Sequence, residues 1–87
     1  MEEVTLAPEV KAASTAADAA REAWRQQSIE VRCMGDENGG WGTDAEYRAA
    51  CRVRDRLRAA YETAWAAFAR AFNAWQGSDL LDPERAS

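Results

Sequence analysis

The feature that most constrains this sequence is a run of 33 residues, 44–76, that contains neither glycine nor proline. An uninterrupted run of this length, rich in alanine and arginine, favours a single α-helix of roughly 50 Å, at about 1.5 Å per residue. Thr43 and Glu46 are spaced as a capping box, in which the hydroxyl accepts from the N–H three residues on and the carboxylate reaches back to the Thr43 N–H. Gly77 is a natural terminator, because glycine readily adopts the left-handed conformation that ends helices. We therefore predict a helix over about residues 44–76.

A second helix is predicted over residues 8–33. Pro8 suits the first turn of a helix, where its missing N–H would have no partner anyway. Downstream of it, mostly apolar or small residues recur at steps of three and four: Val10, Ala13, Ala17, Ala20, Trp24, Gln27 and Val31. Residues 29–33 alternate apolar and charged side chains as a strand does, but no second strand is visible to pair with them. We favour a helix to about Cys33.

The segment between the two predicted helices, residues 34–43, is glycine-rich and is the one clear loop. Two long helices joined by a short loop are expected to pack antiparallel. The predicted fold is therefore all-α: a helical hairpin that forms a single domain over residues 1–87, with a short irregular tail at 77–87. A dimer that assembles as a four-helix bundle is the open alternative.

The predicted second helix carries two apolar seams with the spacing of a coiled coil. The small seam consists of Ala50, Val53, Leu57, Ala60, Ala64, Ala67, Ala71 and Ala74. The aromatic seam consists of Tyr61, Trp65, Phe68, Phe72 and Trp75. Because alanine lets two helices approach closely, we expect the first helix to pack against the small seam, which leaves the aromatic seam only partly covered.

Burying the five rings of the aromatic seam is worth on the order of 10 kcal/mol, and a soluble protein seldom leaves that much aromatic surface in water. Three kinds of cover fit the sequence. The rings are core, packed against the first helix, the tail or the residues before the first helix. They meet the same seam of a second copy in a homodimer. Or they bind a different protein, since Trp and Tyr are favoured in interface hot spots.

Five arginines follow one another closely near the start of the predicted second helix, with Asp55 as the one acidic residue among them. This arginine cluster consists of Arg48, Arg52, Arg54, Arg56 and Arg58. Such a cluster is typical of a phosphate or nucleic-acid site. However, helical spacing places the five around a girdle rather than along a stripe, and the whole chain has a net charge of −4. A solvated, salt-bridged face is therefore the simpler interpretation, and nucleic-acid binding is disfavoured.

Arg54 and Arg58 differ from the rest of the cluster because they continue the aromatic seam toward the start of the helix. Arg58 is also spaced to pair with Glu62 one turn later. We predict Arg54 and Arg58 as an anchor for an acidic or aromatic partner surface. Trp41, in the glycine-rich loop, either folds back on the helix ends or protrudes as a further anchor.

The chain offers little for catalysis or metal binding. It contains no histidine for acid–base chemistry, and no nucleophile has a visible base. Cys33 and Cys51 are too few and too far apart for a disulfide scaffold or a four-thiolate zinc site. We expect no enzymatic activity, no cofactor and no metal.

Three further features indicate origin and compartment. The N-terminal residues are acidic where a secretory signal is basic, and no uncharged stretch is long enough to span a bilayer. We therefore expect a cytoplasmic protein that does not bind membranes. Nearly all basic residues are arginine and alanine is abundant, which indicates GC-rich coding DNA of bacterial or phage origin.

The function expected from these features is that of a non-enzymatic protein–protein interaction module that binds or blocks a protein partner and forms a homodimer. Two alternatives stay open. The chain is an inhibitor encoded by a phage or mobile element, similar to anti-CRISPR proteins, that occupies the surface of a host nucleic-acid-handling complex. Or it binds nucleic acid directly through the arginine cluster.

Overall fold

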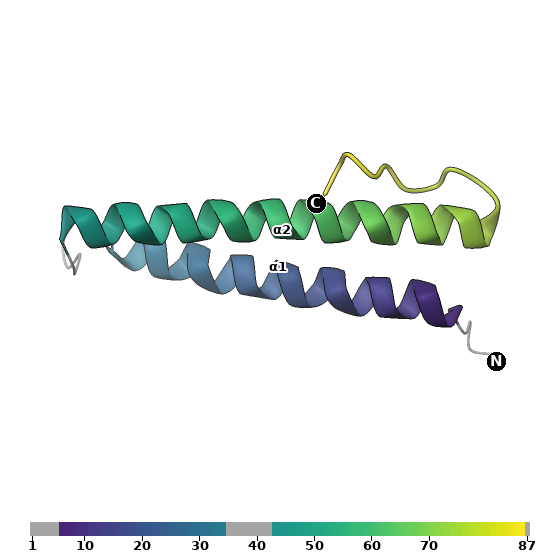
Figure 1. Cartoon of the computed structure of the whole chain (residues 1–87), viewed down its shortest axis with the longest axis horizontal. Helices are drawn as coiled ribbons and strands as arrows, with labels where there is room; N and C mark the ends of the chain where they lie inside the picture. Colours follow the sequence, from purple (N-terminus) through teal and green to yellow (C-terminus); the bar gives the residue numbers. More distant parts are fainter. Residues whose placement is uncertain (1–5, 35–42, 87) are drawn as a thin grey trace.

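The computed structural model describes residues 6–34 and 43–86, which form two long helices lying side by side (Figure 1). Helix α1 spans Pro8–Met34 and helix α2 spans Asp44–Gln76. The molecule is 51 Å along its longest axis. The predicted all-α hairpin is confirmed, with the ends of both helices within one residue of the prediction. The glycine-rich loop at 35–42 and its Trp41 lie outside the described residues.

Both ends of α2 are closed by the residues that the sequence indicated. The Thr43 hydroxyl oxygen accepts from the backbone N–H of Glu46 at 3.1 Å, as in a capping box. The Glu46 carboxylate, however, accepts from the Thr43 hydroxyl at 3.3 Å rather than from the Thr43 backbone N–H. At the other end Gly77 has a left-handed φ of 76°, and its N–H donates to the carbonyl of Asn73 at 2.8 Å.

The core extends along the contact between the two helices, with a stacked aromatic pair near its middle. Tyr61 of α2 is only 2% exposed and stacks on Trp24 of α1, with ring centroids 6.0 Å apart and planes within 7° of parallel. Gln27 adds a polar link, because its side-chain amide donates to the backbone carbonyl of Ala50 at 3.1 Å. The other buried side chains are Val10, Ala17 and Val31 of α1 and Ala69 of α2. The stripe predicted for the first helix is therefore its inner face.

The side of α2 that faces α1 differs in part from the prediction. Helix α1 lies between the two seams, because Trp24 stacks on Tyr61 of the aromatic seam and Gln27 bonds to Ala50 of the small seam. Of the small seam, Ala60, Ala67 and Ala74 are exposed, and the other five members are half-buried. Close approach of methyl groups favours the small seam, but burying a pair of large rings gains more free energy. The stacking of Trp24 on Tyr61 therefore accounts for the shift of α1 toward the aromatic seam.

The C-terminal segment adds a third layer. Residues 78–86 turn back along α2, on the side away from α1 in Figure 1, and end near the middle of that helix. The segment contains one turn, in which the Glu84 N–H donates to the Asp82 carboxylate at 2.9 Å and the Arg85 N–H to the Asp82 carbonyl at 3.2 Å. Residues 78–86 contain no helix or strand, as expected for the tail, and they lie against the helix.

The described residues also bear on membrane and metal binding. Neither α1 nor α2 contains an apolar stretch of the length that crossing a bilayer requires. Among residues 6–34 and 43–86, no group of three acidic or thiol side chains is placed to hold a metal ion. Cys33 and Cys51 are both free thiols, the first exposed and the second half-buried.

We predict that Tyr61→Ala destabilises the hairpin far more than Trp75→Ala does. Tyr61 is at the centre of the core, so its truncation should lower the free energy of unfolding by about 3 kcal/mol, whereas the partly exposed Trp75 should cost about 1 kcal/mol. Urea titration followed by circular dichroism measures both values. Equal losses would contradict the placement of Tyr61 at the centre of the core.

Candidate functional site

Four rings of the aromatic seam, from Trp65 to Trp75, form a continuous column along one face of α2, and Tyr61 precedes them on the same face. Successive centroids are 5.6 Å apart for Trp65 and Phe68, and 5.9 Å apart both for Phe68 and Phe72 and for Phe72 and Trp75. The planes are tilted or edge-on, which is the favoured arrangement of aromatic pairs. The prediction that these rings share one face of a continuous helix is confirmed.

Burial decreases along the aromatic seam. Tyr61 is buried, Trp65, Phe68 and Phe72 are half-buried, and Trp75 is 37% exposed. Near Tyr61 the rings face Ala17 and neighbouring residues of α1. Much of the seam is thus covered within the chain itself, while a second copy or a different protein as additional cover remains a prediction.

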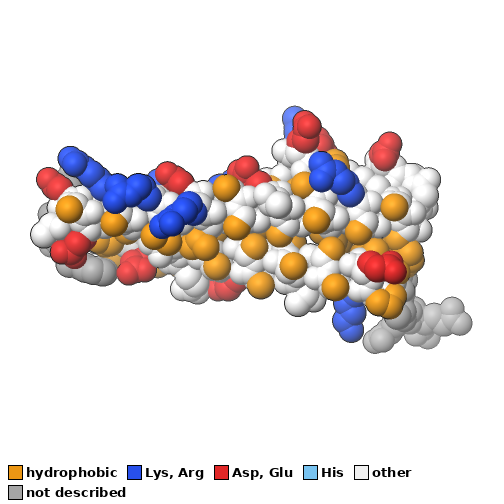
Figure 2. All heavy atoms as spheres, in the orientation of Figure 1, with side chains coloured by type: hydrophobic (Ala, Val, Ile, Leu, Met, Phe, Trp, Pro, Cys, Tyr) orange, Lys and Arg blue, Asp and Glu red, His pale blue; other side chains and the backbone are white. Residues whose placement is uncertain are grey.

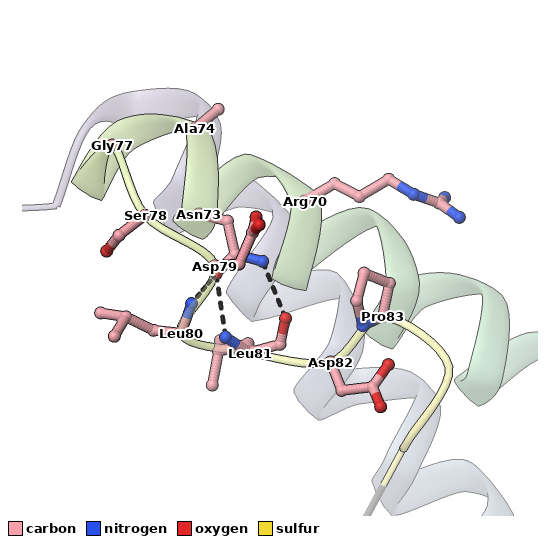
Figure 3. Close-up of a pocket in the computed structure, with 10 residues that line it drawn as sticks. All are labelled: Arg70, Asn73, Ala74, Gly77, Ser78, Asp79, Leu80, Leu81, Asp82 and Pro83. Carbon is pink, nitrogen blue, oxygen red and sulfur yellow. Dashed lines mark hydrogen bonds between the residues drawn. The ribbon is translucent and has the colours of Figure 1, made fainter.

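The tail is held against α2 by two side chains of the helix. The Asn73 amide oxygen accepts from the N–H groups of Leu80 and Leu81 at 3.0 and 2.9 Å, and its nitrogen donates to the Leu81 carbonyl at 2.8 Å (Figure 3). Two turns earlier, the indole N–H of Trp65 donates to the carbonyl of Asp82 at 2.8 Å. Ala69, midway between these two contacts, has no exposed surface. Trp65 therefore serves the intramolecular packing of the tail.

An open groove lies between the two helices in the half of the molecule where α2 begins. Its walls combine arginine, aromatic and small side chains from both helices, and we call it the basic-aromatic groove. The lining residues are Trp24, Ser28, Val31 and Arg32 of α1, and Tyr47, Arg54, Asp55 and Arg58 of α2. Figure 2 shows basic side chains gathered over the first half of α2 on the face in view. Three arginines against one aspartate give the groove a net charge of +2 in a chain of net charge −4.

Arg58 is fixed in this groove by two contacts. Its guanidinium carbon lies 4.5 Å from the centre of the Trp24 ring, within the range of a cation–π interaction. Its Nε donates to the carboxylate of Glu62 at 2.8 Å, which confirms the predicted pair. Since Trp24 also stacks on Tyr61, this wall of the groove continues directly into the core.

The other two arginines of the groove are more loosely held. Arg54 approaches the carboxylate of its neighbour Asp55 at 3.4 Å, which is long for a charge-assisted hydrogen bond. Arg32, across the groove on α1, is exposed and forms no ion pair with any described residue. Both guanidinium groups can therefore donate hydrogen bonds to a bound molecule.

The structure brings together part of the predicted site. Arg54 and Arg58 share the groove, whereas the other three arginines of the cluster are exposed and lie outside its lining. Tyr47 was missed, although it precedes Arg54 by seven residues and so continues the same helical stripe. Arg32 could not be found from the sequence, because its place depends on how α1 pairs with α2.

A second hollow lies between the tail and the end of α2, and Figure 3 shows the residues that line it. It includes Arg70 and Asp79 as well as the Asn73 side chain. Both amide atoms of Asn73 are already bonded to the tail. This hollow is explained by the arch of the tail and is not favoured as a binding site.

Comparisons with protein-family models, with curated proteins and with solved structures found no match for this chain. Its function is therefore inferred from the seam and the groove.

We predict that Asn73→Ala releases the tail while leaving both helices intact. The substitution removes three hydrogen bonds to Leu80 and Leu81, so the exchange of these two amide protons should accelerate about tenfold or more. Hydrogen exchange followed by NMR measures the rates, and the indole N–H resonance of Trp65 should shift. Gln76→Ala, an exposed change near the end of the same helix, is the control and should alter neither. Unchanged protection in Asn73→Ala would show that the tail is held by other contacts.

Proposed function

We propose that this chain is a non-enzymatic protein–protein interaction module that binds a protein partner through the basic-aromatic groove. The observation that carries the proposal is the meeting of three arginines and two aromatic rings from two helices at one open surface. Trp, Tyr and Arg are the residues most enriched in interface hot spots. The aromatic seam, in this proposal, serves first as scaffold, with the exposed ring of Trp75 as an additional contact.

Two properties of the groove support tight docking. Tyr47 is 39% exposed, so a partner has ring surface to cover there. Arg58 is already oriented by Trp24 and Glu62, and binding therefore pays little entropy to order its side chain. The alternative, an inhibitor of phage or mobile-element origin, would bind through the same surface. It would differ from a simple interaction module because its binding would block the activity of a host complex.

The predicted homodimer is a separate proposal, and the packing of α1 limits the form it can take. Because α1 and the tail already cover much of the aromatic seam, a four-helix bundle would form on the exposed part of the small seam, at Ala60, Ala67 and Ala74. Light scattering at a low and a high protein concentration tests this. A dimer that Ala67→Arg converts to monomer supports it, and a mass of 9.6 kDa at both concentrations contradicts it.

We predict that Arg54→Ala and Tyr47→Ala each reduce partner binding about five- to thirty-fold, the range expected for hot-spot truncations. The measurement is quantitative affinity capture from the source cells, with the intact chain as bait. Arg52→Ala is the matched control, because Arg52 belongs to the same cluster and is exposed but does not line the groove.

All variants should keep the helical circular dichroism of the parent, since the substituted side chains lie outside the core. If Arg52→Ala reduces capture as much as Arg54→Ala does, binding depends on the total charge of the chain and the groove is not the binding site. If no variant has an effect, the partner binds elsewhere and the proposal fails.

A further inference from the structure

The basic-aromatic groove has positive charge on both walls and two aromatic rings in its lining. Arg32 comes from α1, and Arg54 and Arg58 come from α2. Building on the proposed function, we infer that the groove binds a short acidic segment of the partner protein, in which two carboxylates flank an apolar or aromatic side chain. The contacts that each groove residue already makes within the chain indicate how many carboxylates the segment carries and why an apolar side chain lies between them.

The three guanidinium groups are not equally available. Arg58 has a carboxylate partner, Glu62, at the 2.8 Å typical of a strong charge-assisted bond. Arg54 has only the long 3.4 Å contact with Asp55, whose side chain is 72% exposed. Arg32 has no ionic partner among the described residues. The guanidinium groups of Arg32 and Arg54, one on each wall, are therefore available to bind two carboxylates. The planar guanidinium matches a carboxylate in geometry.

The apolar part of the groove determines what lies between these carboxylates. Val31 is 4% exposed and so offers a bound ligand almost no surface. Tyr47 is 39% exposed and Trp24 is half-buried, so aromatic surface is what a ligand can cover. A Phe, Tyr or Leu side chain of the partner would pack there and remove that surface from water.

The same charges are too few for nucleic acid. A protein that neutralises three phosphates has a salt slope of only about −2.7, whereas duplex binders commonly make about six to ten such contacts. Arg48, Arg52 and Arg56 do not extend the groove, since none of them lines it. The net charge of −4 adds repulsion from a polyanion at longer range. A short acidic segment needs only the local charge of the groove.

Asp55 gives this inference a distinctive consequence. Its carboxylate lines the groove and lies 3.4 Å from Arg54, so it competes with an acidic ligand for that guanidinium. Asp55→Asn removes the competitor and should raise the affinity for an acidic peptide about two- to five-fold, the worth of an exposed ion pair. A residue that merely supported the fold would not produce a gain of affinity.

The test uses the full chain and three labelled probes in fluorescence anisotropy titrations at low ionic strength. The first is a short peptide of Glu and Gly with a central Phe, the second has Gln in place of every Glu, and the third is single-stranded oligothymidylate. We expect the acidic peptide to bind at least about tenfold more tightly than the Gln peptide, and the affinity to fall with added salt. Arg32→Ala and Arg54→Ala should each weaken it about fivefold or more, while the control Arg52→Ala should not.

Equal binding of the acidic and Gln peptides would overturn the inference, because charge would then play no part. Tighter binding of oligothymidylate would overturn it in favour of nucleic acid. If no acidic peptide binds, yet capture of a cellular partner still depends on Arg54 and Tyr47, the assigned ligand chemistry is wrong and the proposed function stands. If that capture is also insensitive to both residues, the proposed function fails with it.

Discussion

The parallel contact between Trp24 and Tyr61 is the interaction on which the rest of this structure depends. Each ring belongs to a different helix, so their stacking at 6.0 Å fixes both the register of the hairpin and the side of α2 that faces α1. Few other side chains among residues 6–34 and 43–86 are fully buried, as expected because a short chain buries only a modest fraction of its surface. A total stability of roughly 4–13 kcal/mol is typical of this length, so one central aromatic pair supplies a large share of it.

The parts of the fold that depend on local spacing could be predicted from the sequence. The cap at Thr43, the stop at Gly77 and the single face shared by the rings of the aromatic seam all follow from residues within a few turns of one another. The side of α2 against which α1 packs could not be predicted in this way. The alanine spacing of the small seam describes how closely helices can approach, but the position of Trp24 opposite Tyr61 determines which approach buries more area.

The same distinction explains the candidate site. Arg54 and Arg58 were predictable because they share a stripe on one helix, and Tyr47 lies on that stripe too. Arg32 enters the groove only through the pairing of the two helices. The tail is a further case, since the bond from Trp65 to Asp82 joins residues 17 apart and no periodic pattern encodes it. Long-range contacts of this kind require the tertiary arrangement.

The groove and the core are physically connected, because the ring of Trp24 takes part in both. It stacks on Tyr61 and also lies beneath the guanidinium of Arg58. If the groove binds a partner as proposed, its connection to the buried ring of Tyr61 would hold that surface rigid and lower the entropy cost of docking. It also links binding to folding: a ligand at one hundred times its Kd that binds only the folded chain adds about 2.7 kcal/mol of stability. For a hairpin with so small a core, that contribution is comparable to the central ring stack itself, so a ligand of the proposed groove would raise the free energy of unfolding by a large fraction.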